Sequence, residues 1–287
     1  MGMGASLYEN SQIARDHYDQ ADRILGWKLK QVSFQGPAEA LTATRVCQPA
    51  LYVMGYSIGT ILRQRGQLEG LQAVLGLSLG ELTALAVAGA VDYETGLRIV
   101  AERGRLMQVA CETTEGAMAS LIGGSVEAAQ EICGRFDVDL ANLNCPDQVV
   151  ISGGREKIDL AVRAAREEGF RMAVPLNVAG AYHSRLMEPA RRGFVDFLAP
   201  ISFSKPSVAV FSNVTGLPIQ ESDDLKQALL DQVVSPVRWE ACMRNAALMG
   251  ASRFLECGPG KVLGGLARRT DRSWRVDSLE NFTDFPE

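Results

Sequence analysis

The stretch Gly76-Leu77-Ser78-Leu79-Gly80 follows the apolar run Ala-Val-Leu at 73–75 and precedes the helix-forming segment Glu-Leu-Thr-Ala-Leu-Ala-Val at 81–87. A strand that enters a helix through so tight a turn holds its central residue in a strained conformation, and flanking glycines remove Cβ atoms that would clash. The pattern predicts a nucleophile elbow that presents the Ser78 hydroxyl, with the Leu79 amide placed to stabilise negative charge. A glycine-rich turn around a buried serine is the alternative.

A serine hydroxyl needs a base to become a nucleophile, and the chain has two histidines. His183 lies in Gly-Ala-Tyr-His-Ser-Arg-Leu-Met at 180–187, where the chain returns from a predicted inserted module. Because active-site clefts form at such junctions, we predict that His183 is the base, with a structural histidine as the alternative. His17 lies in a charged, helix-like stretch, and we interpret it as a solvated surface residue.

The carboxylate that usually orients such a base is not evident in the sequence. Glu188, Asp196 and Asp231 follow His183 but have the pattern of surface positions on helices. Orientation by a backbone carbonyl or an amide side chain is therefore the expectation. Two histidines without a paired-carboxylate motif leave no ligand set for a metal, so we expect none.

Composition limits the classes of function. The 287 residues are 47% hydrophobic and suit one large domain, or a domain with a smaller insert. A net charge of −5 argues against nucleic acid as a partner, and no apolar stretch reaches the roughly 18 residues that a membrane span needs. Six scattered cysteines without a signal peptide predict reduced thiols and a cytoplasmic protein. Cys257 is an alternative nucleophile, but small buried packing is preferred.

The segment between 117 and 179 changes its periodicity in the order βαββαβ, which is the order of a ferredoxin-like module. Its predicted elements are strands at 118–122, 138–143, 148–152 and 172–178 and helices at 126–136 and 157–168. The flanking parts, 1–116 and 180–287, have α/β character, with strands predicted at 208–211 and 253–256 and helices at 225–234 and 237–248. We expect a hydrolase-like domain with a mostly parallel sheet covered by helices on both faces.

Six segments in this order match one family. The chain resembles malonyl-CoA:acyl carrier protein transacylases and the acyltransferases of polyketide assembly, over nearly its whole length. The matching segments are GLSLGE at 76–81, RGRLMQ at 103–108, NLNCPDQVVISG at 142–153, YHSRLM at 182–187, SPVRW at 235–239 and ECGPGKVL at 256–263.

The resemblance implies a ping-pong transfer from malonyl-CoA to the phosphopantetheine thiol of an acyl carrier protein, by a monomer without a metal or redox cofactor. Ser78 would carry the acyl group and His183 would act as base and then acid. Gln232 would orient His183 through its backbone carbonyl, which accounts for the missing acid. The Leu79 amide would bind the oxyanion.

The resemblance also implies a set of substrate-binding residues. Arg103 would pair with the free carboxylate of the malonyl group, because a planar guanidinium can grip a carboxylate with two hydrogen bonds. From the sequence alone, Arg103 reads as a surface residue of an amphipathic helix. The bulk of Tyr182 would narrow the acyl pocket and favour malonyl over methylmalonyl. The full substrate set is Gln48, Arg103, Met107, Asn144 and Tyr182.

The sequence departs from the family at two places. Leu77 stands where many relatives have histidine. No convincing strand precedes Leu71, whereas relatives begin with an apolar strand and a GQGSQ-like turn that supplies a second oxyanion donor. We therefore expect a missing N-terminal strand and hypothesise that Met1 is an internal start. Two other readings stay open: an acyl-thioester hydrolase of the same fold, and an inactive carrier-binding protein.

Acyl carrier proteins are strongly acidic, so a basic patch must receive them. The candidates are Lys261, Arg268, Arg269 and Arg272, although these residues can equally solvate a C-terminal helix.

Overall fold

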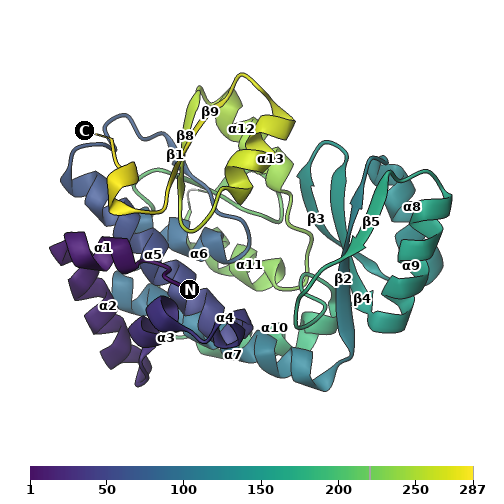
Figure 1. The fold of residues 1–287 in the computed structure, drawn as a ribbon, viewed down its shortest axis with the longest axis horizontal. Helices are drawn as coiled ribbons and strands as arrows, with labels where there is room; N and C mark the ends of the chain where they lie inside the picture. Colours follow the sequence, from purple (N-terminus) through teal and green to yellow (C-terminus); the bar gives the residue numbers. More distant parts are fainter. Residues whose placement is uncertain (220, 287) are drawn as a thin grey trace.

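The computed structural model of the protein describes residues 1–219 and 221–286, which form an α/β fold with three separate sheets. Helices surround two small sheets, and a four-stranded sheet stands at one end of the molecule (Figure 1). Both termini lie in the helical body, away from the four-stranded sheet (Figure 1). Within the described residues, no helix is long and apolar enough to cross a bilayer.

Five helices occupy the first 64 residues, and the first described strand begins at Ala73. The helix-prone stretch at 7–25 is divided at Ser11, whose hydroxyl accepts a hydrogen bond from the Ala14 amide and so caps the second helix. The five helices are α1 (Ala5–Asn10), α2 (Gln12–Leu25), α3 (Leu29–Gln35), α4 (Ala38–Thr42) and α5 (Thr44–Gln64).

The first sheet has the order β1-β6-β7, with β1 and β6 parallel and β7 antiparallel to β6. Val210 and Phe211 of β6 are fully buried, so the middle strand of this small sheet lies inside the core, whereas β1 is half-buried and β7 lies nearer the surface. Its strands are β1 (Ala73–Val74), β6 (Ala209–Phe211) and β7 (Pro218–Ile219). The helices in the same part of the chain are α6 (Leu79–Val87), α7 (Tyr93–Thr113), α10 (Glu188–Leu198) and α11 (Ser222–Gln232), with a 3-10 turn at Arg185–Met187.

The predicted βαββαβ order is confirmed, with element ends shifted by a few residues at most. The four strands form an antiparallel sheet of order β3-β4-β2-β5, and α8 and α9 lie on its outer side (Figure 1). Two main-chain hydrogen bonds of Val237, with Ala141 and Leu143, join β3 to the rest of the molecule. The elements are β2 (Gly116–Ile122), α8 (Val126–Phe136), β3 (Asp139–Cys145), β4 (Gln148–Gly154), α9 (Arg155–Glu167) and β5 (Met172–Pro175).

The third sheet is a parallel pair near the C-terminus. Its elements are β8 (Arg253–Cys257) and β9 (Arg275–Leu279), with α12 (Trp239–Leu248), α13 (Val262–Thr270) and a 3-10 turn at Phe282–Asp284 nearby.

The expectation of one mostly parallel sheet is wrong for the described residues. The parallel pairs β1–β6 and β8–β9 belong to different sheets. A cavity of about 700 Å³ lies between β1 and β8, and both strands contribute to its wall. Among the described residues, β1, β8 and β9 each have one pairing partner and β6 has two, and the helices α5 and α6 close the cavity from the side.

The turn between β1 and α6 depends on one glycine. An added Cβ at Gly76 would lie 1.8 Å from the carbonyl carbon of Gly80, so only glycine allows this close approach. At Gly80 nothing lies within 4 Å of an added Cβ. The steric explanation given for both glycines is therefore right for Gly76 and wrong for Gly80.

This difference predicts opposite effects of two alanine substitutions. Gly76→Ala should lower the free energy of unfolding by at least about 1–3 kcal/mol, because the turn must open to admit the methyl group. Gly80→Ala should leave it unchanged or raise it by about 0.5–1 kcal/mol, because Gly80 lies within α6. Urea unfolding followed by tryptophan fluorescence measures both, and a Gly76→Ala variant as stable as the wild type would show that the turn admits a methyl group without opening.

Candidate active site

Ser78 joins β1 to α6 in a strained conformation, with φ 53° and ψ −107°. Positive φ is uncommon for a residue with a Cβ and costs energy that surrounding contacts must offset. Asn213, which follows β6, provides such contacts from a buried position. Its Oδ1 accepts the Ser78 amide at 2.6 Å, and its Nδ2 donates to the Gly76 carbonyl at 2.8 Å. Sequence reasoning missed Asn213, which belongs to none of the matched segments.

The predicted contact between His183 and Ser78 is present. His183 Nε2 lies 2.8 Å from Ser78 Oγ, and Nδ1 lies 2.9 Å from the Gln232 backbone carbonyl, as expected. A carbonyl oxygen can only accept, so Nδ1 carries the proton. The neutral ring therefore presents a bare Nε2 to the serine hydroxyl.

The environment of His183 favours its neutral form. The side chain is almost fully buried, with 4% of its surface exposed. Burial, with the nearby positive charge of Arg103 as the second cause, lowers the pKa of His183 to about 4. Ser78 itself is half-buried, whereas His183 and Arg103 are buried. At neutral pH the site holds a base that is ready to accept a proton.

Arg103 lies on α7 and is buried, not on the surface as its helix pattern alone indicates. Its Nη2 donates to Ser78 Oγ at 3.1 Å and to Gln232 Oε1 at 2.8 Å, while Nη1 donates to Gln48 Oε1 at 2.7 Å. Nε is buried and has no hydrogen-bond partner among the described residues. Burial lowers the pKa of Arg103 to about 10, which still leaves the guanidinium charged at neutral pH.

Gln48 and Met107 complete the wall beside this arginine. Gln48 Nε2 donates to Met107 Sδ at 3.6 Å, and both side chains are buried. Gln48 therefore contacts Arg103 directly, and Met107 is linked to Arg103 through Gln48.

Tyr182 and Asn144 occupy more distant positions. The Tyr182 hydroxyl is hydrogen-bonded to the Thr44 hydroxyl, and burial raises its pKa. Asn144 lies on β3, and its Oδ1 is buried without a partner among the described residues. Among the described residues, neither forms a hydrogen bond with Ser78. Leu79, the first residue of α6, has an amide without an acceptor inside the helix.

A buried carboxylate adjoins the site, and sequence reasoning gave it no role. Glu81 is 2% exposed and accepts two hydrogen bonds at Oε2, from Gln232 Nε2 at 2.6 Å and from the Asn213 amide at 3.1 Å. Burial raises the pKa of Glu81 to about 7. Gln232 Nε2 also donates to the Ser78 carbonyl at 3.0 Å. The side chain of Gln232 thus has contacts that its predicted role, through the backbone alone, did not include.

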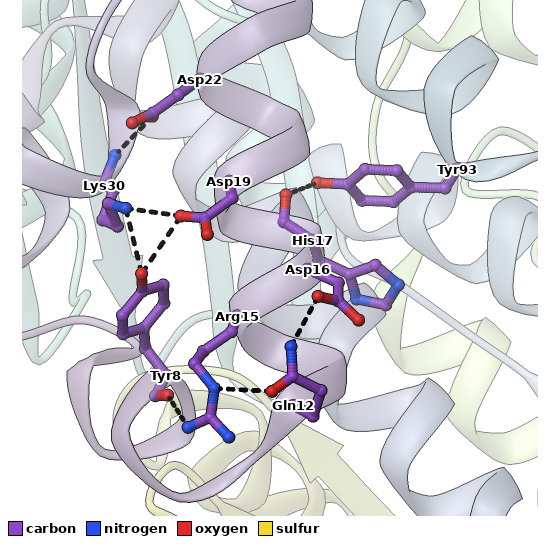
Figure 2. Close-up of polar contacts among 9 residues, drawn as sticks. All are labelled: Tyr8, Gln12, Arg15, Asp16, His17, Asp19, Asp22, Lys30 and Tyr93. Atoms are coloured by element: carbon purple, nitrogen blue, oxygen red, sulfur yellow. Dashed lines mark hydrogen bonds and ion pairs between the residues drawn. The ribbon is translucent and has the colours of Figure 1, made fainter.

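The second histidine is not the solvated residue that we expected. Figure 2 shows His17 on α2, where its backbone carbonyl accepts a hydrogen bond from Tyr93 at 2.7 Å. Its ring stacks on Tyr93 at 4.7 Å between centroids, and Nδ1 lies 3.1 Å from Ser57 Oγ. Burial lowers its pKa to about 4. His17 is therefore a packed structural histidine.

The cysteines are all free, but one lies in an unexpected place. Cys257, at the end of β8, is exposed, so the prediction of small buried packing is wrong for it. Its thiol has a weak contact of 3.8 Å with the Leu255 carbonyl.

Comparison with known proteins agrees with this geometry. The acyl transferase domain model matches residues 1–281. The chain is 38% identical over 286 residues to malonyl CoA-acyl carrier protein transacylase of Bacillus subtilis, covering 98% of this chain and 90% of that protein. It is also 38% identical to the polyketide biosynthesis malonyl CoA-acyl carrier protein transacylase PksC of the same organism, covering 93% and 92% of the two chains.

A solved structure agrees over the same length. It is a complex of a type II PKS acyl-carrier protein with its malonyl-transacylase, and it superposes with a TM-score of 0.95 at 32% identity. The match covers 99% of this chain and 93% of that one. This chain is a member of the acyl transferase domain family.

Proposed function

We propose that this acyltransferase moves a malonyl group from malonyl-CoA to the phosphopantetheine thiol of an acyl carrier protein. The observation that carries the proposal is the contact of Ser78 Oγ with both His183 Nε2 and the buried Arg103. The nucleophilic oxygen thus contacts both its base and a cation that can bind the carboxylate of the substrate. The names of the relatives, and the carrier bound in the solved complex, support the same substrates.

In the first half of the reaction, His183 removes the proton of the Ser78 hydroxyl as its oxygen attacks the thioester carbonyl. The oxyanion that forms accepts a hydrogen bond from the Leu79 amide at the start of α6. When the intermediate collapses, the carbon–sulfur bond breaks and His183 returns its proton to the sulfur of coenzyme A. The product is a malonyl ester on Ser78.

In the second half of the reaction, the same residues transfer the malonyl group from Ser78 to the carrier. His183 takes the proton of the carrier's thiol, and the thiolate attacks the serine ester. The carbon–oxygen bond to Ser78 then breaks, and His183 protonates the departing serine oxygen. The proton balance closes within this one imidazole, so the proposal includes neither a metal nor a redox cofactor.

Arg103 selects for an acyl group with a free carboxylate. Its donors point to neutral amides and to the serine, and its buried Nε is unpartnered among the described residues. A carboxylate that enters would meet a desolvated cation and be held by charge-assisted hydrogen bonds. An acyl group without the carboxylate would leave that charge unpaired, which typically costs roughly a hundredfold in selectivity.

We propose that the acidic carrier docks on exposed basic residues near the C-terminus. All four candidates are exposed, and Arg269 Nη1 donates to Gln148 Oε1 of β4 at 2.7 Å. This contact places α13 beside the antiparallel sheet, so that a docked carrier would face both parts of the chain. The candidates are Lys261, Arg268, Arg269 and Arg272. Free thiols and the use of a coenzyme A thioester support a cytoplasmic location.

The finer description of the fold belongs to the same proposal. We propose a hydrolase-like domain from residues 1–116 and 180–287 and a ferredoxin-like subdomain from 117–179. The antiparallel order β3-β4-β2-β5, with two helices on one side, supports the second assignment. The β1–Ser78–α6 turn supports the first.

Substitution of Arg103 tests the substrate assignment. Intact-mass measurement after mixing with malonyl-CoA should show a malonyl adduct on the wild type and none on Ser78→Ala. Arg103→Ala should acylate about a hundredfold more slowly with malonyl-CoA, and lose less with acetyl-CoA, because acetyl has no carboxylate. Arg105→Ala, an exposed arginine on the same helix, is the matched control. If the acylation rate of Arg103→Ala fell equally with both substrates, Arg103 would not be the group that binds the malonyl carboxylate.

Transfer is distinguished from hydrolysis by the fate of the acylated enzyme. A hydrolase of this fold would share Ser78 and His183 and pass the acyl group to water. Pre-acylated protein should be stable for minutes in buffer and lose its adduct within seconds when a phosphopantetheinylated carrier is added. A carrier of fatty acid synthesis and one of polyketide synthesis should be compared. Release of malonate at the same rate with and without a carrier would favour the hydrolase.

The pH dependence of acylation tests the base. Since the pKa of His183 is lowered to about 4, its neutral form is present from pH 8 down to pH 5 and is lost as pH falls through about 4. The second-order rate constant for acylation should therefore stay nearly level between pH 8 and 5. Quenched-flow mass measurement gives the rate, with fluorescence as the check that the protein remains folded. An acid limb centred near pH 6.5 that persists in a Glu81→Gln variant would show an unperturbed imidazole, since the pKa of Glu81 is raised to about 7.

A further inference from the structure

Glu81 is a buried carboxylate that the reaction steps above do not use. It lies in the first turn of α6, three residues after the nucleophile, and is 2% exposed. Burial of a carboxyl group is costly unless hydrogen bonds satisfy it. None of the hydrogen bonds formed by the described residues joins Glu81 to the serine hydroxyl or to the histidine ring, so any influence on them passes through other residues.

Two donors from distant parts of the chain converge on the same oxygen, Oε2. One is the backbone amide of Asn213 at 3.1 Å, and the other is Gln232 Nε2 at 2.6 Å. Both donors are fully buried, and both residues hold the main chain of Ser78. Asn213 binds its amide and Gln232 binds its carbonyl.

Gln232 extends the effect of Glu81 to the other two reactive groups. Its Oε1 accepts from Arg103 Nη2 at 2.8 Å, and its backbone carbonyl accepts from His183 Nδ1 at 2.9 Å. Since the acceptor at Glu81 faces the NH2 end of this amide, the oxygen end must face Arg103. Without Glu81 the amide orientation would depend on the Ser78 carbonyl and Arg103 alone, and a reversed amide would set its NH2 group against the donors of the guanidinium.

We infer that Glu81 is a positioning residue of the proposed transfer, which holds Gln232 and Asn213 so that the nucleophile, its base and the carboxylate-binding arginine stay in register. This inference rests on the proposed function. A displacement of about 1 Å in such a site can cost on the order of a hundredfold in rate. For this role, the side chain at position 81 must be long enough to place an acceptor oxygen at Gln232 and Asn213.

Reach and charge can be separated at this position. The pKa of Glu81 is raised to about 7, so the carboxyl group is partly protonated at neutral pH, and a protonated carboxyl can still accept at Oε2. Glu81→Gln keeps the length and an acceptor oxygen but removes the charge. Glu81→Asp keeps the charge but withdraws the oxygens by about 1.5 Å. The two variants are therefore opposite tests of the same site.

The experiment measures single-turnover acylation by malonyl-CoA for both variants, with urea unfolding as the check of folding. We expect Glu81→Gln to stay within about threefold of the wild type and Glu81→Asp to fall at least tenfold. Glu127→Asp, at an exposed glutamate in the first turn of α8, is the matched control and should not change the rate. Aspartate equal to or faster than glutamine in folded proteins would overturn the inference and indicate a role of charge.

A second measurement tests whether Glu81 acts through Gln232. In a Gln232→Ala background, Glu81→Asp should cost less than about threefold further, because the amide that it positions is gone. A full additional tenfold loss would overturn the assignment of the effect to Gln232. If the aspartate variant does not fold, a folded Glu81→Gln variant whose acylation rate falls more than tenfold would likewise overturn the inference. A wild type that malonyl-CoA does not acylate refutes the proposed function instead, so the two failures are distinguishable.

Discussion

The side chain and backbone of Gln232 form the interaction on which the site depends. This one buried residue accepts from His183 and Arg103 and donates to Glu81 and to the Ser78 carbonyl. Each of these groups is a polar atom in a region with little water, where a missing partner costs more than a present one contributes. Removal of one member therefore leaves buried polar groups unpaired, and the geometry of the nucleophile, the base and the arginine is set together.

Backbone strain at the nucleophile is offset by the same network. Ser78 and His183 both have positive φ, at 53° and 56°, although neither is glycine. Such conformations persist where surrounding contacts determine them, and they concentrate at functional sites. Asn213 holds the turn from one side and Gln232 from the other, while Gly76 allows the chain to pass close to α6. Strain and network thus place the hydroxyl at the half-exposed end of an otherwise buried cluster.

Local patterns predicted much of this structure, and long-range contacts account for what they missed. The module at 117–179 was predictable because its helices and strands alternate with clear periodicity, and the Ser78 turn because a short motif specifies it. Glu81 reads as an ordinary helix residue, since its partner Gln232 is 151 positions away. The separate sheets were equally hidden, because a two-residue strand such as β1 has no periodicity that fixes its neighbours.

The spacing of charges explains how the site can keep a cation ready for substrate. The described residues include no direct ion pair between Glu81 and Arg103, and the neutral amide of Gln232 lies between them. A carboxylate in contact with the guanidinium would satisfy it internally and compete with any anionic substrate. Amides satisfy part of its hydrogen-bonding capacity without neutralising its charge. Burial is the main cause that lowers the pKa of His183, and the positive field that remains adds to it, so the arginine that attracts a carboxylate also helps to keep the base unprotonated.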